Sequence, residues 1–294
     1  MEYKNLASYF REKYGRRLKK ICIDGGFTCP NRDGKCSFGG CIFCGERGAG
    51  EHIDADRSAD ACTSIREQVE AALSHASAED LFVAYFQNFT NTYADPDTLR
   101  QRYDSALIDE RIRVLAIGTR PDCIDEEIAE LIASYRTRVD LWVELGLQTS
   151  SDKTAKIINR GYDSEAFSAA VEILHRWGIP VVAHVMIGLP TEGDEELAAT
   201  VSFLKGHRIF GVKLHSVYVM EGTVLAEMYR RGEYEPISRE DYVRRAAFAI
   251  RELGDGVVFH RITGDCPRDL LVAPLWNTEK SAVIEEIRRR LGEM

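Results

Sequence analysis

The sequence predicts an α/β protein whose parallel sheet curls into a barrel or part of a barrel. Short runs rich in Val, Ile and Leu alternate with helical segments along most of the chain. Such near-continuous apolar runs are typical of strands that are buried on both faces of a parallel sheet. Six or seven of these strand–helix units in 294 residues favour one large domain.

Each strand is bounded by residues that favour turns or helix starts. A helix is expected at residues 4–16, and the first strand, Lys20–Asp24, stops at a glycine pair. Ser58 is the expected N-cap of a helix that runs to about residue 74, because Ile65 and Val69 then share one face. The later strands are expected at 81–87, 114–119, 139–149, 180–190, 211–219 and 256–262.

The remaining helices are placed by proline, glycine and apolar periodicity. Pro96 is expected to begin a helix, and Gly161 is expected to break the segment 152–177 into two helical pieces. Cys22, Cys62 and Cys123 are expected to be buried small residues. One further helix is expected to end at residue 135. The others are expected to span about 194–205, 223–231, 239–253 and 279–291.

The overall charge argues against a dedicated nucleic-acid binder. The formal net charge is −9 and the pI is near 5.4, whereas such proteins are usually basic. One basic segment nevertheless lies within residues 1–20. Two interpretations of it stay open, an amphipathic helix packed on the barrel by its aromatic side chains or an RNA-binding patch. Its cations are Lys4, Arg11, Lys13, Arg16, Arg17, Lys19 and Lys20.

The cysteines favour metal binding or catalysis over disulfides. Residues 1–20 lack the apolar segment of a signal peptide, and no apolar run approaches the length of a membrane span. We therefore expect a cytoplasmic protein without membrane contact, in which thiols stay reduced. Eight cysteines, four of them within Thr28–Cys44, then favour a metal site.

The stretch Thr28–Cys44 has the composition of a loop wrapped round a metal or a cluster. It carries Cys29, Cys36, Cys41 and Cys44 among several glycines. Thiolates are soft ligands that select zinc, copper(I) or iron–sulfur clusters. A closed structural site would use all four thiols, whereas a four-iron cluster held by three thiols would leave one iron open. The cysteine count alone leaves both open.

Polar side chains follow or interrupt almost every predicted strand. In α/β barrels the chemistry lies at the carboxyl ends of the strands. Polar groups in apolar strands cost free energy unless they are paired, so their recurrence predicts a shared polar cavity. These residues are Gln87, Asn88, Thr119, Arg120, Glu144, Gln148, His184, His215, Tyr218, His260 and Arg261.

The cysteine loop carries a resemblance to a known family. The segment DGGFTCPNRDGKCSFGGCIFC resembles the cluster loop of the YhcC-type bacterial radical S-adenosylmethionine (SAM) proteins, which are related to the radical domain of the elongator acetyltransferases. The resemblance continues through AYFQNFTNTYA, IGTRPDCI, WVELGLQT, INRGYD, HVMIGLP, VKLHSVYVMEGT, HRITGD and LLVAPLW, and it covers Tyr9 to Trp276. It implies a partial (β/α)6 barrel with a core at about 17–220 and a C-terminal strand and helix extension at about 221–294, all in one domain.

The resemblance implies a [4Fe–4S] cluster that cleaves SAM to a 5′-deoxyadenosyl radical. Cys29, Cys41 and Cys44 match the ligand positions, with Cys-x11-Cys-x2-Cys spacing instead of the Cys-x3-Cys-x2-Cys of most such enzymes. Cys36 stands where the family pattern demands no cysteine, and it is a spare thiol or a fourth ligand. An electron donor such as flavodoxin or ferredoxin is implied as a partner. The alternative is a non-catalytic zinc or iron–sulfur protein with a closed four-cysteine site.

The resemblance also implies contacts to SAM. Phe43 matches the aromatic residue near the adenine, and Arg160 is a natural carboxylate clamp. Plainer interpretations stay open: a surface arginine for Arg160, and core residues for His184 and Met186. The implied cofactor-binding set is Phe43, Gln87, Asn88, Thr119, Arg120, Glu144, Gln148, Arg160, His184 and Met186.

The substrate stays open between tRNA, a small molecule and a peptide. The elongator relationship and the basic N-terminal segment favour RNA, whereas the acidic net charge favours the other two. A thiol at Cys266 would be able to pass a hydrogen atom to a substrate radical, although an ordinary loop thiol is the plainer interpretation. The substrate-side candidates are His215, Tyr218, His260 and Cys266.

Overall fold

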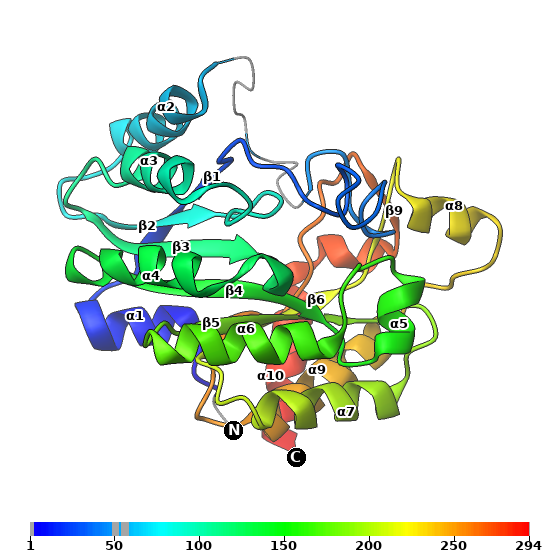
Figure 1. Ribbon diagram of the computed structural model, residues 1–294. Helices are drawn as coiled ribbons and strands as arrows, with labels where there is room; N and C mark the ends of the chain where they lie inside the picture. Colours follow the sequence, from blue (N-terminus) through cyan, green and yellow to red (C-terminus); the bar gives the residue numbers. More distant parts are fainter. Residues whose placement is uncertain (1–2, 49–52, 54–58, 294) are drawn as a thin grey trace.

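Seven parallel strands form one curled sheet in the computed structural model, which describes residues 3–48, 53 and 59–293 (Figure 1). Their order is β1-β2-β3-β4-β5-β6-β8, and every neighbouring pair is parallel. The predicted α/β fold is therefore confirmed, as a half-barrel. The strands are β1 (Leu18–Ile23), β2 (Leu81–Phe86), β3 (Ile112–Thr119), β4 (Asp140–Gln148), β5 (Val181–Ile187), β6 (Gly211–Ser216) and β8 (Val258–Arg261).

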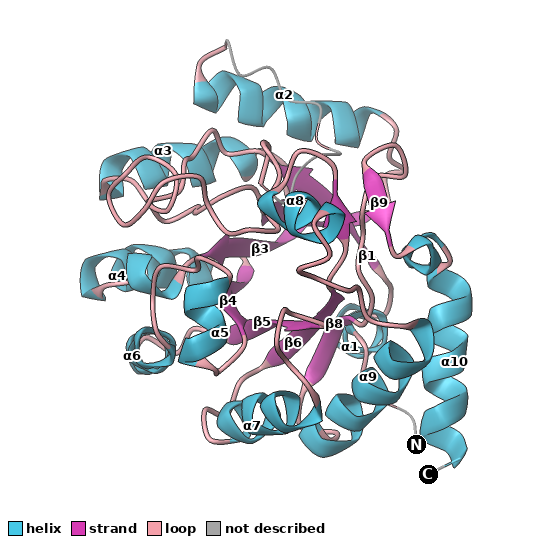
Figure 2. Ribbon diagram, turned by 90° about the vertical axis from the view of Figure 1, so that its right-hand side faces the viewer, coloured by secondary structure: helices cyan, strands magenta, loops and turns pink. Residues whose placement is uncertain are grey.

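Helices lie outside the arc of strands, while loops gather over its carboxyl ends (Figure 2). Several helices begin at an aspartate whose side chain accepts a hydrogen bond from the backbone three residues on, as at Asp95, Asp125 and Asp163. The helices are α1 (Leu6–Tyr14), α2 (Ala61–Ser74), α3 (Pro96–Ala106), α4 (Glu126–Ser134), α5 (Asp152–Ile157), α6 (Ser164–Arg176), α7 (Asp194–Lys205), α8 (Val224–Arg230), α9 (Arg239–Leu253) and α10 (Lys280–Glu293).

The amino end of the half-barrel is filled by an apolar plug. Leu6 and Phe10 of α1 pack there against inward-facing side chains of the strands, among them Val83, Trp142 and Val182. The aromatic face predicted for the N-terminal helix is therefore confirmed as a packing face. A second, larger apolar layer lies between the outer face of the sheet and the helices. The interior of the half-barrel is thus closed at one end and polar at the other.

The sheet is open between its two end strands, β1 and β8. Within the described part of the chain these two strands are not paired with each other. The backbone N–H of Phe259 on β8 instead donates to the carbonyl of Lys4, at 2.8 Å. The prediction that Cys22 is buried was wrong, because β1 is an edge strand and Cys22 is exposed. Cys62 and Cys123 are half-buried.

The C-terminal segment departs from the predicted pattern. The strand expected at 211–219 ends at Ser216, because the chain then turns and β7 (Val219–Met220) pairs antiparallel with β9 (Leu271–Ala273). The short strand β9 was not predicted. β8, also from this segment, joins the main sheet, although the division into a core and an extension stays a prediction.

The N-cap of α2 differs from the predicted one. The expected cap Ser58 lies outside the described residues, and α2 is capped by Asp60, whose side chain accepts from the Thr63 N–H. Among the described residues no helix has both the length and the apolar character needed to cross a membrane.

Candidate active site

The loop after β1 is held in shape by its own backbone and by one arginine. The backbone N–H of Arg32 donates to the carbonyl of Cys29 at 2.8 Å, and that of Cys44 donates to Cys41 at 2.9 Å. The Arg32 guanidinium donates to the carbonyl of Cys44 at 3.1 Å. Gly40 has a φ of +80°, and a Cβ there would lie 3.0 Å from Nε of Arg32. The loop therefore presents its thiols from a defined backbone.

Three of the four loop thiols face one cavity, here named the thiol cavity. Cys29, Cys41 and Cys44 line it together with residues from the carboxyl ends of the strands. Cys36 is exposed and does not line it, and its Sγ lies 3.9 Å from Oδ2 of Asp122. The three thiols predicted as ligands are thus grouped apart from the fourth.

The donor set of the thiol cavity is of the soft kind that zinc, copper(I) and iron–sulfur clusters select. Among the described residues no three Cys, His, Asp or Glu side chains are close enough to hold one metal ion. Burial and the neighbouring thiols of Cys44 and Cys29 raise the pKa of Cys41 to about 12, so a bound metal would be needed for this thiol to ionise near neutral pH. Thr90 Oγ1 and His215 Nε2 line the same cavity without a hydrogen-bond partner in the described chain. The cavity therefore offers soft ligands beside polar groups that a cofactor would satisfy.

Most of the predicted cofactor-binding residues line the thiol cavity. Met186 lines a second cavity, here named the adjoining cavity, which shares His184 with the first. Asn88 and Arg160 are buried and line neither cavity. The residues in the thiol cavity are Phe43, Gln87, Thr119, Arg120, Glu144, Gln148 and His184.

Gln148 is turned toward the cavity by a strained backbone. Its φ is +60°, a left-handed conformation that residues with a Cβ rarely adopt. The Tyr162 hydroxyl donates to the carbonyl of Gly146 at 2.6 Å and to Oε1 of Gln148 at 3.2 Å. A Cβ on Gly146 would lie 2.6 Å from Nε2 of Gln148. Gly146 therefore leaves the room in which the Gln148 amide lies.

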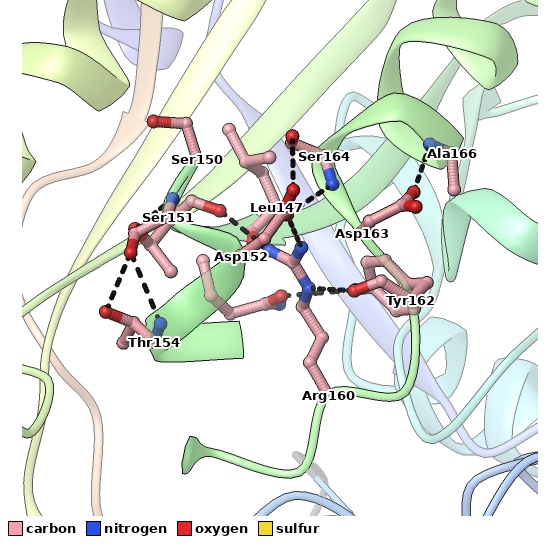
Figure 3. A network of polar contacts seen from close by, with 12 residues as sticks. Leu147, Ser150, Ser151, Asp152, Thr154, Arg160, Tyr162, Asp163, Ser164 and Ala166 are labelled. Carbon is pink, nitrogen blue, oxygen red and sulfur yellow. Dashed lines mark hydrogen bonds and ion pairs between the residues drawn. The ribbon is translucent and has the colours of Figure 1, made fainter. Parts of the chain in front are cut away.

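Arg160 is fully buried and braces the backbone that follows β4. Its Nη1 donates to the carbonyls of Leu147 and, at 2.7 Å, of Thr149, and its Nε donates to the carbonyl of Tyr162 at 3.0 Å (Figure 3). Oδ1 of Asp152 lies 3.5 Å from Nη2. The interpretation of Arg160 as a surface arginine is wrong, because its exposed fraction is 0%. Its role as a carboxylate clamp stays a prediction.

Arg120 connects this brace to the cysteine loop. Its Nη1 donates to the carbonyl of Arg160 at 2.9 Å and lies 4.0 Å from Sγ of Cys29. Its other nitrogens pair with Asp122 at 2.9 and 2.7 Å, and its guanidinium lies 4.7 Å from the centre of the Tyr162 ring. The positive charge of Arg120 therefore lies beside the thiol of Cys29.

A buried ion pair lies at the wall of the thiol cavity. Glu144 on β4 contacts the Lys213 ammonium from β6, and both side chains are at most 2% exposed. Lys213 also donates to the hydroxyl of Tyr85 at 2.8 Å. The Glu144 carboxylate accepts from Nε1 of Trp142 at 3.0 Å and lies 2.8 Å from Nε2 of His184. These partners offset the cost of burying the two charges.

The ion pair shifts the protonation of its members. Burial lowers the pKa of Lys213 to about 7, although Glu144 opposes that shift. Burial by itself would raise the pKa of Glu144, but the Lys213 charge and the hydrogen bond from His184 hold it well below its usual range. Burial also lowers the pKa of His184 and of His215. Lys213 is therefore a candidate acid or base near neutral pH.

Three of the four substrate-side candidates lie near one another, because Cys266 interacts electrostatically with Tyr218, and His260 is apart from them. His215 and Tyr218 line the adjoining cavity. Cys266 is buried and does not line it, although the preceding residue, Asp265, does. His260 lies at the other end of the interior, beside the apolar plug, and lines neither cavity.

Several residues of the site, Arg32 among them, were missed by the sequence reasoning. Lys213, Tyr85 and Tyr162 were not singled out, although each lines the thiol cavity. The signal for Lys213 was present, since a lysine in the middle of the apolar run GVKLHSV is unusual. The two tyrosines carried no comparable signal, because tyrosine is common in apolar strands and in loops.

Two family models match the chain. The Radical SAM superfamily matches residues 33–204, and the Radical SAM C-terminal domain matches residues 209–293. The first match covers more than half of the 294 residues.

Two of the similar proteins match this chain over almost its whole length. YtqA of Bacillus subtilis is 34% identical over 98% of this chain and 89% of its own, and YhcC of Escherichia coli is 33% identical over 100% and 94%. A tRNA uridine(34) acetyltransferase of Methanocaldococcus jannaschii is 32% identical over 56% of this chain and 30% of its own. Among solved structures, Elp3 of Methanocaldococcus infernus has a TM-score of 0.66 at 19% identity, over 93% of this chain and 63% of Elp3, which is a likeness of fold.

Proposed function

Because the chain belongs to the Radical SAM superfamily, we propose that it is a radical SAM enzyme whose [4Fe–4S] cluster is held by Cys29, Cys41 and Cys44. When bound, the cluster and SAM supply a 5′-deoxyadenosyl radical that takes a hydrogen atom from the substrate. The observation that carries this proposal is the grouping of the three thiols in one cavity with polar side chains from β2 to β6, while Cys36 lies outside it.

The residues around the thiol cavity would bind and orient SAM. Phe43, between two of the thiol ligands, offers an aromatic face, and the amide of Gln148 offers both a donor and an acceptor. Thr90 adds a hydroxyl that has no partner among the described residues. Arg160 acts on Gln148 through the backbone, and Tyr162 contacts both the Gly146 carbonyl and the Gln148 amide, so we assign both a positioning role.

The Lys213–Glu144 pair would hold or move a proton during the reaction. Lys213 lines the thiol cavity and has a pKa lowered to about 7 by burial. Its Nζ is able to keep its proton beside Glu144 or to release it to a group in the cavity. The apolar plug on the far side keeps the pair away from bulk water, which strengthens its field.

Two observations point to different substrate classes. Similarity to the tRNA uridine(34) acetyltransferase supports RNA, while the net charge of −9 supports a small molecule or a peptide. A reductant of the flavodoxin or ferredoxin class completes the proposed system. Comparing modified tRNA nucleosides and metabolites between a deletion strain and its parent tests the two classes directly.

The decisive experiment is anaerobic reconstitution with iron and sulfide, followed by dithionite and SAM. We expect about four iron and four sulfide per chain, and formation of 5′-deoxyadenosine. Cys29→Ser, Cys41→Ser and Cys44→Ser should each lose the cluster and the product. Cys36→Ser is the matched control, because that thiol is outside the cavity, and it should keep both.

The closed four-cysteine alternative predicts the opposite pattern. About one zinc per chain without sulfide, lost when Cys36 is replaced, would support that alternative and contradict our proposal. A chain that holds the cluster but never cleaves SAM would contradict the enzymatic part alone.

A further inference from the structure

The basic N-terminal segment divides into two groups of cations. Four of its seven cations form ion pairs, with N–O distances of 2.6 to 3.6 Å. The other three, Arg11, Arg17 and Lys20, form no ion pair in the part of the chain that the structure describes. The paired cations are Lys4 with Glu12, Lys13 with Asp140, Arg16 with Glu79, and Lys19 with Asp80.

The three unpaired cations line a single pocket, here named the basic pocket. Arg261 from β8 and Arg288 from α10 line it with them, and no Asp or Glu is among its described lining residues. The pocket is formed by α1, β1, β8 and α10, at the opening between the two end strands of the sheet. Arg261, with Asp265 at 3.6 Å, is the one lining arginine or lysine that forms an ion pair among the described residues, although Lys20 also interacts electrostatically with Glu144.

A buried histidine closes the inner end of the basic pocket. His260 is 9% exposed, and neither ring nitrogen has a hydrogen-bond partner among the described residues. Its Nδ1 lies 3.8 Å from Oε1 of Glu144, which is beyond hydrogen-bond length. The ring therefore lies between the basic pocket and the Glu144 carboxylate, and the cations at the pocket wall carry the case for an anion.

The charges of the basic pocket suit a phosphate group. Five like charges around one concave site repel each other and raise the local concentration of anions. Four of the five charged residues are arginines, and planar guanidinium groups match phosphate oxygens two at a time. We propose that the basic pocket binds a phosphate group, carried by a nucleotide or by an RNA strand.

The basic pocket and the thiol cavity share one residue. Arg261 lines both, and Lys20 and Lys213 approach the ring of Tyr85 to 5.6 and 4.2 Å. A ligand held by its phosphate in the basic pocket would therefore lie beside the cavity in which the cluster is proposed. Only this link to catalysis rests on the proposed function, since phosphate binding is measurable without cluster or SAM.

The test compares two double variants that remove the same charge. Arg17→Gln with Arg288→Gln changes two exposed residues of the basic pocket. Arg16→Gln with Lys19→Gln, the matched control, removes two paired cations outside it. Calorimetric titration of the full chain would use pyrophosphate, AMP, and an RNA oligonucleotide with and without a 5′-phosphate. Thermal unfolding checks that all variants are folded.

We expect the pocket variant to bind the phosphate probes at least about tenfold more weakly, and the control to change by less than about twofold. AMP binding as tightly as RNA would identify a nucleotide as the source of the phosphate, and much tighter RNA binding would identify a strand. No binding of any probe at about 1 mM, or equal weakening in both double variants, would overturn the proposal.

Discussion

The two ends of the half-barrel are built from the same strands but have opposite chemistry. On β4, Trp142 packs into the apolar plug, while Glu144, two residues further, belongs to the ion pair at the thiol cavity. The first end contains dispersion contacts that stabilise the fold, and the second contains thiols, charges and strained backbone. Stability and chemistry are therefore separated along each strand, as is general in α/β barrels.

The largest effect is expected when a substitution creates a cavity in the apolar plug. Phe10→Ala removes a side chain that is 2% exposed, so we expect the free energy of unfolding to fall by about 4 kcal/mol. Urea unfolding measures the loss. Phe38→Ala is the matched control, because that ring is 76% exposed and should change stability by less than about 0.5 kcal/mol. The folded fraction of Phe10→Ala should still bind iron, and loss of iron binding would contradict the separation.

The second test moves to the polar end. Glu144→Gln removes the counter-charge that keeps Lys213 protonated, so Lys213 must be buried either as an unpaired charge or as a neutral amine, and we expect a loss of about 3 kcal/mol in urea unfolding at neutral pH. Adding Lys213→Met removes this unpaired polar group and should restore most of that loss. A double variant as unstable as the single one would show that the pair does not act as a unit.

A smaller effect is expected where the polar end is strained. Gly146→Ala introduces a Cβ at 2.6 Å from Nε2 of Gln148, so that amide must move. We expect a loss of about 2 kcal/mol and weaker SAM binding in equilibrium dialysis of the reconstituted protein. At Gly256 the same change meets no atom within 4 Å, so Gly256→Ala should leave SAM binding unaltered. Equal effects at both positions would argue against a positioning role for Gly146.

The smallest expected effect is a pH dependence of the free energy of unfolding, caused by His260 beside the apolar plug. Burial lowers the pKa of His260 to about 4 from the usual 6.5, so between these values the unfolded chain binds more protons than the folded one. Stability is then complete above pH 6.5 and falls with decreasing pH, by about 1 kcal/mol per pH unit from this residue. Urea unfolding from pH 7 to 5 should show a shallower slope for His260→Gln. The exposed His75→Gln is the control, and an equal slope in both variants would remove His260 from the explanation.

The fold followed from the sequence more completely than the site did. Strand and helix positions came within a few residues because apolar periodicity and caps act locally, as in α7, found at the predicted 194–205. The error at 211–219 arose because β9, more than fifty residues away, pairs with Val219. Likewise the cysteine spacing was visible, but the exclusion of Cys36 from the cavity depends on Asp122 and on how the loop folds back.

The sequence by itself determined the parallel α/β fold, the cysteine-rich loop and the family, because these depend on patterns within short stretches of chain. The tertiary structure decided which charges are paired. Glu144 meets Lys213 across 69 residues, and Arg17 meets Arg288 in one pocket while its neighbour Arg16 is neutralised by Glu79. Such choices depend on strand register and sheet curvature, which place residues that are distant in sequence within a few ångströms of each other.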